Sequence, residues 1–260
     1  MIIDFHAHIY PEKVAEKASN AIGVFYNAPM VYNGTSQMLL NSGSKINVTN
    51  YVVHSAATGK AQVESINNFS SNEVSLHKEF IGFGTIHPDY EDFESELKRI
   101  KTAGLKGIKL HADFQKFQMD EERMDPVYEV CASLGLIVLA HAGDYRFDYT
   151  GPKRLLTLPK KHPNLKFVAA HFGGYTEWEQ AYEYLAGENI YFDTSSTLWK
   201  LSLDKTMKMI DKHGTDKFLF GSDYPMWDHS DELARFNTLK ISQKEKEDIL
   251  YNNAKKLLEL

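Results

Sequence analysis

Short apolar runs recur along this chain, and most of them end in a histidine. The runs are rich in β-branched and aromatic residues and are bounded by Gly, Pro, Asn or Asp, a combination that favours strands over helices. From the second run onward their starts lie roughly 25 to 30 residues apart, about the length of one strand-plus-helix unit. We predict eight strands: Ile2–Ile9, Ile46–His54, Phe80–Ile86, Lys106–His111, Leu136–His141, Leu165–His171, Ile190–Thr194 and Lys217–Ser222.

Amphipathic stretches separate several of these runs. Tyr90–Ala103, Asp125–Leu134 and Trp178–Ala186 each show the apolar spacing of a helix. Several runs are apolar on both faces, which suits parallel strands covered by helices. The alternation predicts an α/β fold, a (β/α)8 TIM barrel, and 260 residues match the about 250 that one such barrel needs. We therefore expect a single barrel domain over residues 1–260, with Asp248–Leu260 as a terminal helix that closes its bottom or side.

One interval breaks this rhythm and forms an insertion after the first strand. Tyr10–Lys45 separates the first two strands and contains Tyr26, Pro29 and Met30 within an irregular stretch. A segment that follows the carboxyl end of a barrel strand lies over the active face. Two alternatives remain open at this point: the insertion forms part of a substrate lid, or it is a packed surface loop.

Composition and charge exclude several classes of protein. The chain is 43% hydrophobic and 25% charged, which argues against disorder. A net charge of −6 without a long Lys/Arg block disfavours nucleic-acid binding. No stretch approaches the about 20 apolar residues of a membrane span, and the N-terminus lacks the features of a signal peptide. Cys131 is the only cysteine, so no intrachain disulfide can form, and we expect it to be a small core residue. These features predict a cytoplasmic protein.

The histidines at the strand ends are the strongest functional signal. His6 and His8 are two residues apart in a strand, so both side chains can point to the same face. His141 and His171 end later strands, and Asp223 follows the last one. In a barrel the carboxyl ends of all strands share one face, which would gather these groups around one pocket. Imidazoles with one carboxylate suit Zn²⁺ and are compatible with Mn²⁺ or Fe²⁺.

The same residues lie in segments that resemble a known family. The chain is similar to the amidohydrolase superfamily over nearly its whole length, and most similar to the branch that includes aminocarboxymuconate-semialdehyde decarboxylase and related metal-dependent hydrolases. The resemblance implies the (β/α)8 barrel, one divalent metal ion and a homodimer as a plausible assembly. The segments that carry it are Asp4-Phe5-His6-Ala7-His8, Leu139-Ala140-His141-Ala142-Gly143, Ala169-Ala170-His171-Phe172-Gly173-Gly174, Phe220-Gly221-Ser222-Asp223-Tyr224-Pro225 and Asn252-Asn253-Ala254-Lys255-Lys256-Leu257-Leu258.

Carried over position by position, the resemblance implies roles for five residues. His6, His8 and His141 would be metal ligands, and Asp223 would be the fourth ligand or the partner of the metal-bound water. His171 would be the catalytic acid–base. The division between His141 and His171 rests on the resemblance, and the two residues could share the metal differently. A metal ion of this kind lowers the pKa of its bound water to around 7, and Asp223 could orient that water or accept its proton.

Lys109 and His111 in the fourth strand face the same way and leave two alternatives open. A buried lysine is costly unless it is paired or modified. In binuclear relatives a lysine at this strand is carbamylated and bridges two metals. We favour an unmodified Lys109 paired with a carboxylate, with both Lys109 and His111 as substrate contacts. A hydroxyl after the seventh strand, at Ser195, is a further candidate for binding substrate.

Other notable side chains have weaker assignments. His54 and His87 also end strands, and we expect each of them to contact the residues that bind the metal, without binding it, or to pack against a loop. Four more histidines are expected to be solvated or to cap helices: His77, His162, His213 and His229. Three cations follow the fifth strand and are expected to lie on the surface: Arg146, Lys153 and Arg154. Two tryptophans follow the seventh and eighth strands and either line the pocket or pack in the core: Trp199 and Trp227.

Two enzyme functions compete for this site. The leading hypothesis is a metal-dependent hydrolase, in which a metal-activated water attacks an amide, ester or lactone carbonyl of a small molecule. The alternative is a non-oxidative decarboxylase that acts on an unsaturated or aromatic carboxylic acid, and an arginine at the metal face would favour it. A metal-dependent deoxyribonuclease is disfavoured because Lys109 and His111 stand where a bridging glutamate is usual. A scaffold protein without activity would lack a ligand, and none is missing.

Overall fold

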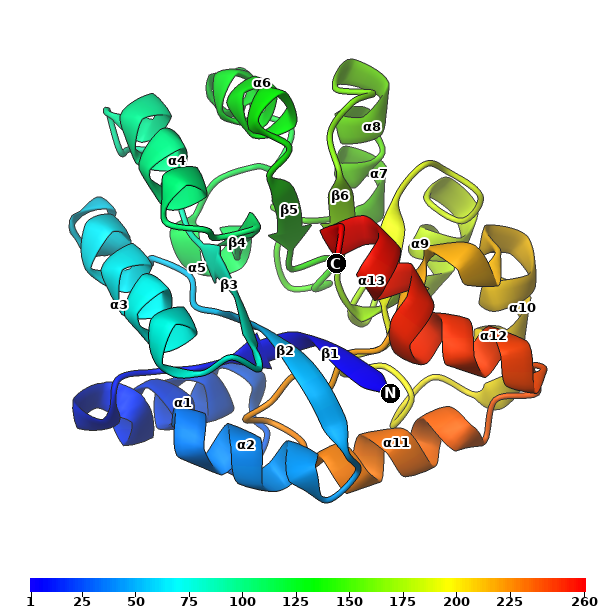
Figure 1. The fold of residues 1–260 in the computed structure, drawn as a ribbon. Coiled ribbons are helices and arrows are strands. Elements are labelled where there is room, and N and C mark those ends of the chain that lie inside the picture. The colour runs from blue at the N-terminus through cyan, green and yellow to red at the C-terminus, as the bar shows by residue number, and fades with distance from the viewer.

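The computed structural model describes all 260 residues, and eight parallel strands pair in chain order from β1 to β8 (Figure 1). All eight predicted strands are confirmed, although each is shorter than predicted, and His111, His141 and His171 lie beyond the strands that they were expected to end. Their bounds are β1 Ile2–His8, β2 Val48–His54, β3 Phe80–Gly84, β4 Gly107–Leu110, β5 Ile137–Ala140, β6 Phe167–Ala169, β7 Tyr191–Asp193 and β8 Phe218–Leu219.

The first and last strands close the sheet into a barrel. Phe5 N donates to Phe220 O over 2.8 Å, and Asp223 N donates to His6 O over 2.9 Å. Ala7 and Tyr224 form an isolated parallel bridge just beyond the end of β8. The predicted (β/α)8 TIM barrel is therefore confirmed, and the residues that follow β8 are held against β1.

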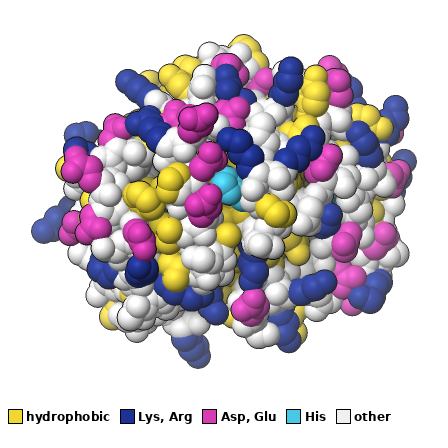
Figure 2. Space-filling model, turned by 90° about the horizontal axis from the view of Figure 1, so that it is seen from above, with side chains coloured by type: hydrophobic (Ala, Val, Ile, Leu, Met, Phe, Trp, Pro, Cys, Tyr) yellow, Lys and Arg dark blue, Asp and Glu magenta, His cyan; other side chains and the backbone are white.

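Helices surround the strands on the outside of the barrel (Figure 1). The predicted helices are confirmed, with identical bounds for α6, Asp125–Leu134. The other helices over the sides are α3 Val63–Leu76, α4 Phe93–Thr102, α5 Ala112–Gln115, α7 Pro152–Leu155, α8 Thr157–Lys161, α9 Trp178–Tyr184, α10 Leu203–His213, α11 His229–Asn237 and α12 Gln243–Glu247. No helix is both long and apolar enough to cross a membrane. On the face shown in Figure 2, basic and acidic side chains are interspersed with hydrophobic ones.

The terminal helix plugs one end of the barrel, as the sequence predicted. A short π-helical segment, Asp248–Asn252, leads into α13, Asn253–Leu258. Leu257 and Leu258 are buried in a cluster with residues from the lower interior of the barrel, among them Phe5. Burying a leucine contributes about 1.5–3 kcal/mol relative to leaving it in water. These contacts fill the end of the barrel opposite the histidines.

The insertion after β1 is more regular than its sequence indicated. It contains two helices, α1 Glu12–Tyr26 and α2 Ser36–Ser44, so the prediction of an irregular stretch is wrong. Only Ala15 and Ser19 of α1 are buried, whereas the apolar Val24 is exposed. The sequence left open whether the insertion is part of a substrate lid or a packed surface loop, and the two helices differ in this respect. The end of α1 reaches the central cavity, whereas α2 packs against the outside of the barrel through the buried Leu39.

Candidate metal centre

A cavity of about 460 Å³, including its opening to solvent, lies at the carboxyl ends of the strands. Six residues singled out in the sequence line it, and they come from five different strands. These are His8, Lys109, His111, His141, His171 and Asp223. The rest of the wall is mainly apolar or aromatic: Ile22, Tyr26, Met30, Phe114, Tyr175, Ser196, Pro225 and Met226. The sequence-based expectation of one shared pocket is thus met for most of the predicted residues.

Three donor atoms converge at the base of the cavity. His6 Nε2 lies 3.2 Å from His8 Nε2 and 3.4 Å from Asp223 Oδ1, and His8 Nε2 lies 3.5 Å from the same oxygen. Ligands about 2.0–2.1 Å from a tetrahedral ion are separated from one another by about 3.3 Å. The three atoms therefore have the spacing of ligands around one small divalent ion, and the donor set fits such an ion.

The protonation states in this cluster also suit a metal ion. Burial lowers the pKa of His6 well below its usual value, and the charge on Lys109 lowers it further. Burial likewise lowers the pKa values of His8 and His141. Burial raises the pKa of Asp223, but the neighbouring His6 and His8 outweigh that effect and hold it well below its usual range. Neutral imidazoles and an ionised carboxylate are the forms that bind metals.

Asp193 fixes the orientation of His6. His6 Nδ1 donates to Asp193 Oδ2 over 2.8 Å, which leaves Nε2 free to face His8. Asp193 Oδ1 accepts from the backbone N–H groups of His171 and Ser195, so this carboxylate is fully engaged. A carboxylate behind a ligating histidine sets its tautomer and raises its affinity for metal. Asp193 was not assigned a role from the sequence, although its place at the end of the seventh strand could have indicated one. Only the hydroxyls that follow it were considered, as substrate contacts.

His141 and His171 form a second close pair in the cavity wall. His141 Nδ1 lies 3.1 Å from His171 Nε2. The hydroxyl of Ser195 lies 2.9 Å from His171 Nδ1 and is fully buried, so it contacts His171 and does not line the cavity. Ser196 lines the cavity in its place. The backbone of Ser196 has φ 47°, so the chain turns here in a left-handed conformation, and Ser196 rather than Ser195 reaches the cavity.

Lys109 points at the metal-binding cluster and has no acidic partner. Its Nζ lies 3.1 Å from His6 Nε2, and the side chain is fully buried. Lys109 takes part in no ion pair, so the expected pairing with a carboxylate is not formed. Burial lowers the pKa of Lys109 to about 8, which makes the neutral amine accessible near neutral pH.

Tyr26 and Asp113 belong to the site but were not identified as functional residues from the sequence. The Tyr26 hydroxyl, at the end of α1, lies 3.0 Å from His111 Nε2 and 3.4 Å from His141 Nε2. Asp113 Oδ2 lies 3.5 Å from the same His141 nitrogen, and burial raises the pKa of Asp113 to about 7. The His111 and His141 rings stack 4.2 Å apart with a 7° tilt. Together these contacts hold His141 with its Nδ1 toward His171.

The candidate cations after the fifth strand and the tryptophans after the seventh and eighth strands lie outside the cavity. Arg146 pairs with Asp144, and Arg154 pairs with Asp120 and Asp148, so no arginine lines the cavity. Lys153 is exposed. Trp199 and Trp227 stack on each other at 5.5 Å between ring centroids, and neither lines the cavity.

Three histidines that we expected to be solvated or capping are buried. His162 bonds to Asp125, His213 stacks on Phe192, and His229 bonds to Asp4 and Ser42. The expectation was wrong because their partners come from distant parts of the chain. His77 is half-buried at the end of α3, and His87 is buried next to Asp89. His54 is fully buried beside His6 and His8.

Comparisons with known proteins agree with this geometry. A family model described as Amidohydrolase matches residues 3–260, whereas no curated protein matches the chain. Dihydroxybenzoic acid decarboxylase from Polaromonas sp. JS666, with bound manganese and the inhibitor 2-nitroresorcinol, is 16% identical with a TM-score of 0.78, covering 100% of this chain and 97% of that one.

Two further solved structures are similar over nearly their whole length. A 2,6-dihydroxybenzoate decarboxylase from Rhizobium is 15% identical with a TM-score of 0.77, covering 99% of this chain and 98% of its own. A 5-carboxyvanillate decarboxylase from Novosphingobium aromaticivorans, which contains manganese, is 15% identical with a TM-score of 0.77, covering 100% and 97%. These likenesses establish the barrel fold. Because the family model spans almost every residue, this protein belongs to the amidohydrolase family.

Proposed function

We propose that this protein is a metal-dependent decarboxylase of a small aromatic or unsaturated carboxylic acid. The observation that carries the proposal is the composition of the cavity: a metal-type donor cluster at the base and flat side chains, Tyr26, Phe114 and Tyr175, in the wall. This wall suits a planar substrate. The similar structures named above are decarboxylases, which supports this alternative over the hydrolase that the sequence analysis placed first.

The proposed ligands are His6, His8 and Asp223, with His141 as the fourth. A single divalent ion fits them; the nitrogen-rich set favours zinc, and the manganese in two similar structures makes that ion the other candidate. The ion would supply positive charge beside the substrate carboxylate. Lys109 is the only cation in the cavity wall, and in this proposal it adds charge on the same side.

The reaction breaks the bond between the carboxylate carbon and the substrate. Carbon dioxide leaves, the electron pair stays on the substrate carbon, and that carbon then takes up a proton. We assign the proton transfer to His171, which lines the cavity and has its Nδ1 held by the Ser195 hydroxyl. The other nitrogen, Nε2, lies 3.1 Å from His141 Nδ1, and in this proposal the proton passes to the substrate from Nε2.

The test is a substrate panel of hydroxybenzoates, other unsaturated carboxylates, esters and lactones, with release of carbon dioxide and of acid measured separately. Carbon dioxide release that falls by about 10²–10⁴-fold in His171→Asn supports the proposal. The matched control is His77→Asn, which changes a half-buried histidine outside the cavity and should leave the rate unchanged. Turnover of esters or lactones alone would contradict decarboxylation.

Hydrolysis is the second candidate, and one observation favours it. No arginine lines the cavity, although an arginine is a common partner for a substrate carboxylate. The ionised Asp223 could act as the base for an attacking water. The same panel separates the two functions, since a hydrolase produces acid from an ester or lactone without releasing carbon dioxide.

A further inference from the structure

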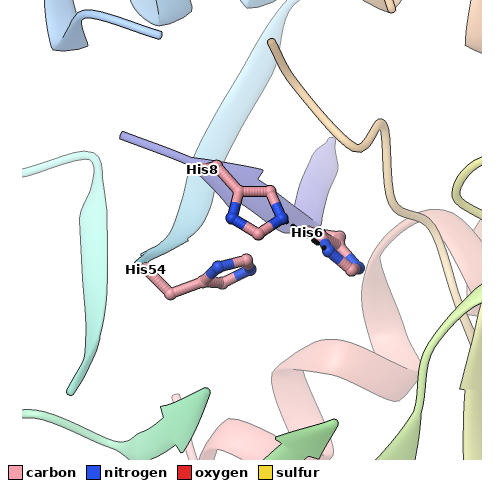
Figure 3. Close-up of side chains that lie close together, drawn as sticks. All are labelled: His6, His8 and His54. Carbon is pink, nitrogen blue, oxygen red and sulfur yellow. Dashed lines mark hydrogen bonds between the residues drawn. The ribbon is translucent and has the colours of Figure 1, made fainter. Parts of the chain in front are cut away.

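His54 lies beside the donor cluster without any hydrogen-bond partner. It ends β2 and stands directly opposite His8 of β1 in the parallel register. Its ring centroid is 4.5 Å from that of His8 and 4.9 Å from that of His6. Figure 3 shows the three rings turned toward a common space from two neighbouring strands.

Both ring nitrogens of His54 are buried and unsatisfied. The residue has no exposed surface, and neither Nδ1 nor Nε2 has a hydrogen-bond partner. A buried polar group without a partner costs about 1–3 kcal/mol, so such a group is usually satisfied by something that binds there. His54 does not line the cavity, so a substrate in the cavity would not reach it in this structure. The missing partner must fit into the space among the imidazoles.

A metal ion matches that space and the chemistry of the group. One ring nitrogen each from His6, His8 and His54 can be chosen so that all three lie within 4.8 Å of one another. Nitrogens around one ion with bonds of about 2.1 Å are at most about 4.2 Å apart, so the three rings would need to approach one another by no more than about 0.6 Å to share an ion.

A second group of three residues, His6, His171 and Asp193, also has possible ligand atoms within 4.8 Å of one another. It is the weaker candidate because Asp193 is already engaged by His6 Nδ1 and by two backbone N–H groups. His54 has no competing partner at either nitrogen.

We propose that His54 is a metal ligand contributed by β2, in addition to the ligands from β1 and Asp223. The inference rests on the metal binding in the proposed function and adds a donor that the resemblance did not assign. With His54 in place, the ion would be held by three adjacent segments of the barrel: β1, its neighbour β2, and the residue after β8 on the other edge of β1.

The experiment compares the full-length wild type with His54→Phe, which keeps a planar ring and removes both nitrogens. The metal-free proteins are titrated with Co²⁺ in competition with a chelator, and the visible absorption spectrum of the bound Co²⁺ reports its coordination. We expect His54→Phe to bind Co²⁺ at least about tenfold more weakly and to show an altered spectrum. The control is His213→Phe, which removes another buried histidine with an unsatisfied Nε2 far from the cluster and should bind like the wild type.

Thermal unfolding provides a readout that does not depend on activity. Without metal, His54→Phe should be at least as stable as the wild type, because it removes two unsatisfied buried nitrogens. With metal, its rise in Tm should be smaller than that of the wild type. If His54→Phe does not fold, His54→Gln is titrated in its place and should show the altered spectrum.

The outcomes separate this inference from the proposed function. Unchanged affinity and an unchanged Co²⁺ spectrum in the folded His54 variant would overturn the inference alone. A wild type that binds no Co²⁺, Zn²⁺ or Mn²⁺ would overturn both the inference and the proposed metal-dependent function.

Discussion

Two fully buried histidines on either side of β1 have opposite surroundings. His229, from α11, bonds through Nε2 to Asp4 Oδ2 over 2.9 Å and through Nδ1 to the Ser42 hydroxyl over 2.8 Å. His54, on the cavity side, has no partner at either nitrogen. The same side chain at the same burial thus serves two purposes. An imidazole that is hydrogen-bonded at both nitrogens connects parts of the fold, whereas an imidazole without hydrogen bonds, next to other imidazoles, indicates a place for a ligand.

The largest effect should follow from removing a proposed ligand on the cavity side. We expect His8→Ala to lose its bound metal and nearly all activity, because only two of the three converging donors remain. Metal content measured by plasma mass spectrometry on the wild type and the variant checks this. About one ion per wild-type chain fits the single site. Two ions would instead favour a carbamylated Lys109 that bridges them, the alternative left open by the sequence.

The next largest effect should be on stability and should follow from removing His229, the histidine with both ring nitrogens hydrogen-bonded. His229→Ala should lower the free energy of unfolding by about 3 kcal/mol, because it empties a fully buried site and removes the imidazole that bonds to the Asp4 carboxylate, which keeps only its bonds from His6 N and from Ser222. Urea unfolding of the metal-free protein measures this change. His77→Ala, at a half-buried position, should change it by less than about 0.5 kcal/mol. If His229→Ala were as stable as the wild type, the contrast between the two histidines would lose its basis.

His213 offers an intermediate case, with one satisfied and one unsatisfied nitrogen. Its Nδ1 accepts from Gly187 N, whereas Nε2 is unpartnered, and burial lowers its pKa to about 4. The unfolded chain takes up a proton near pH 6.5 and the folded chain does not. Stability should therefore fall as the pH decreases from about 6.5 to about 4, by up to about 1.4 kcal/mol per pH unit.

Urea midpoints across this pH range check the prediction, with His213→Phe as the comparison. The variant should show a flatter dependence on pH than the wild type. Equal slopes for the two proteins would show that His213 does not carry the effect.

The smallest effect should come from His111, whose ring is hydrogen-bonded to Tyr26 of the insertion after β1. His111 has one partner, the Tyr26 hydroxyl, and its Nδ1 is unsatisfied. Tyr26→Phe would leave His111 as unpartnered as His54, at a cost of about 0.5–1.5 kcal/mol. We expect a change of a few-fold in KM with metal content unchanged. A loss of metal in this variant would mean that α1 supports the metal site directly.

The sequence predicted the barrel well because its signals are local. Each strand is a short apolar run, and the pair His6 and His8 relies only on alternation within one strand. Asp223 could be predicted as a site residue because it comes directly after the last apolar run, which is also a local feature of the sequence.

The partners of these groups were harder to predict because they depend on contacts between distant segments. His229 and Asp4 are 225 residues apart, and Tyr26 and His111 are 85 residues apart. No pattern within one element indicates that such groups meet. Ser195 was the hydroxyl proposed after β7, but Ser196 lines the cavity because the backbone turns beyond the end of that strand.

The seam between β1 and β8 also constrains how the protein is made. Asp4 accepts hydrogen bonds from His6 N and Ser222 N, so the first strand and the segment after the last strand share one buried carboxylate. A ribosome releases Asp4 and His6 long before Asp223, which follows His6 by 217 residues. Until then the open edge of β1 is unpaired, a state that favours aggregation. The complete set of donors therefore forms only after Asp223 has left the ribosome, so a metal ion held by this set would be taken up after the eighth strand has joined the first.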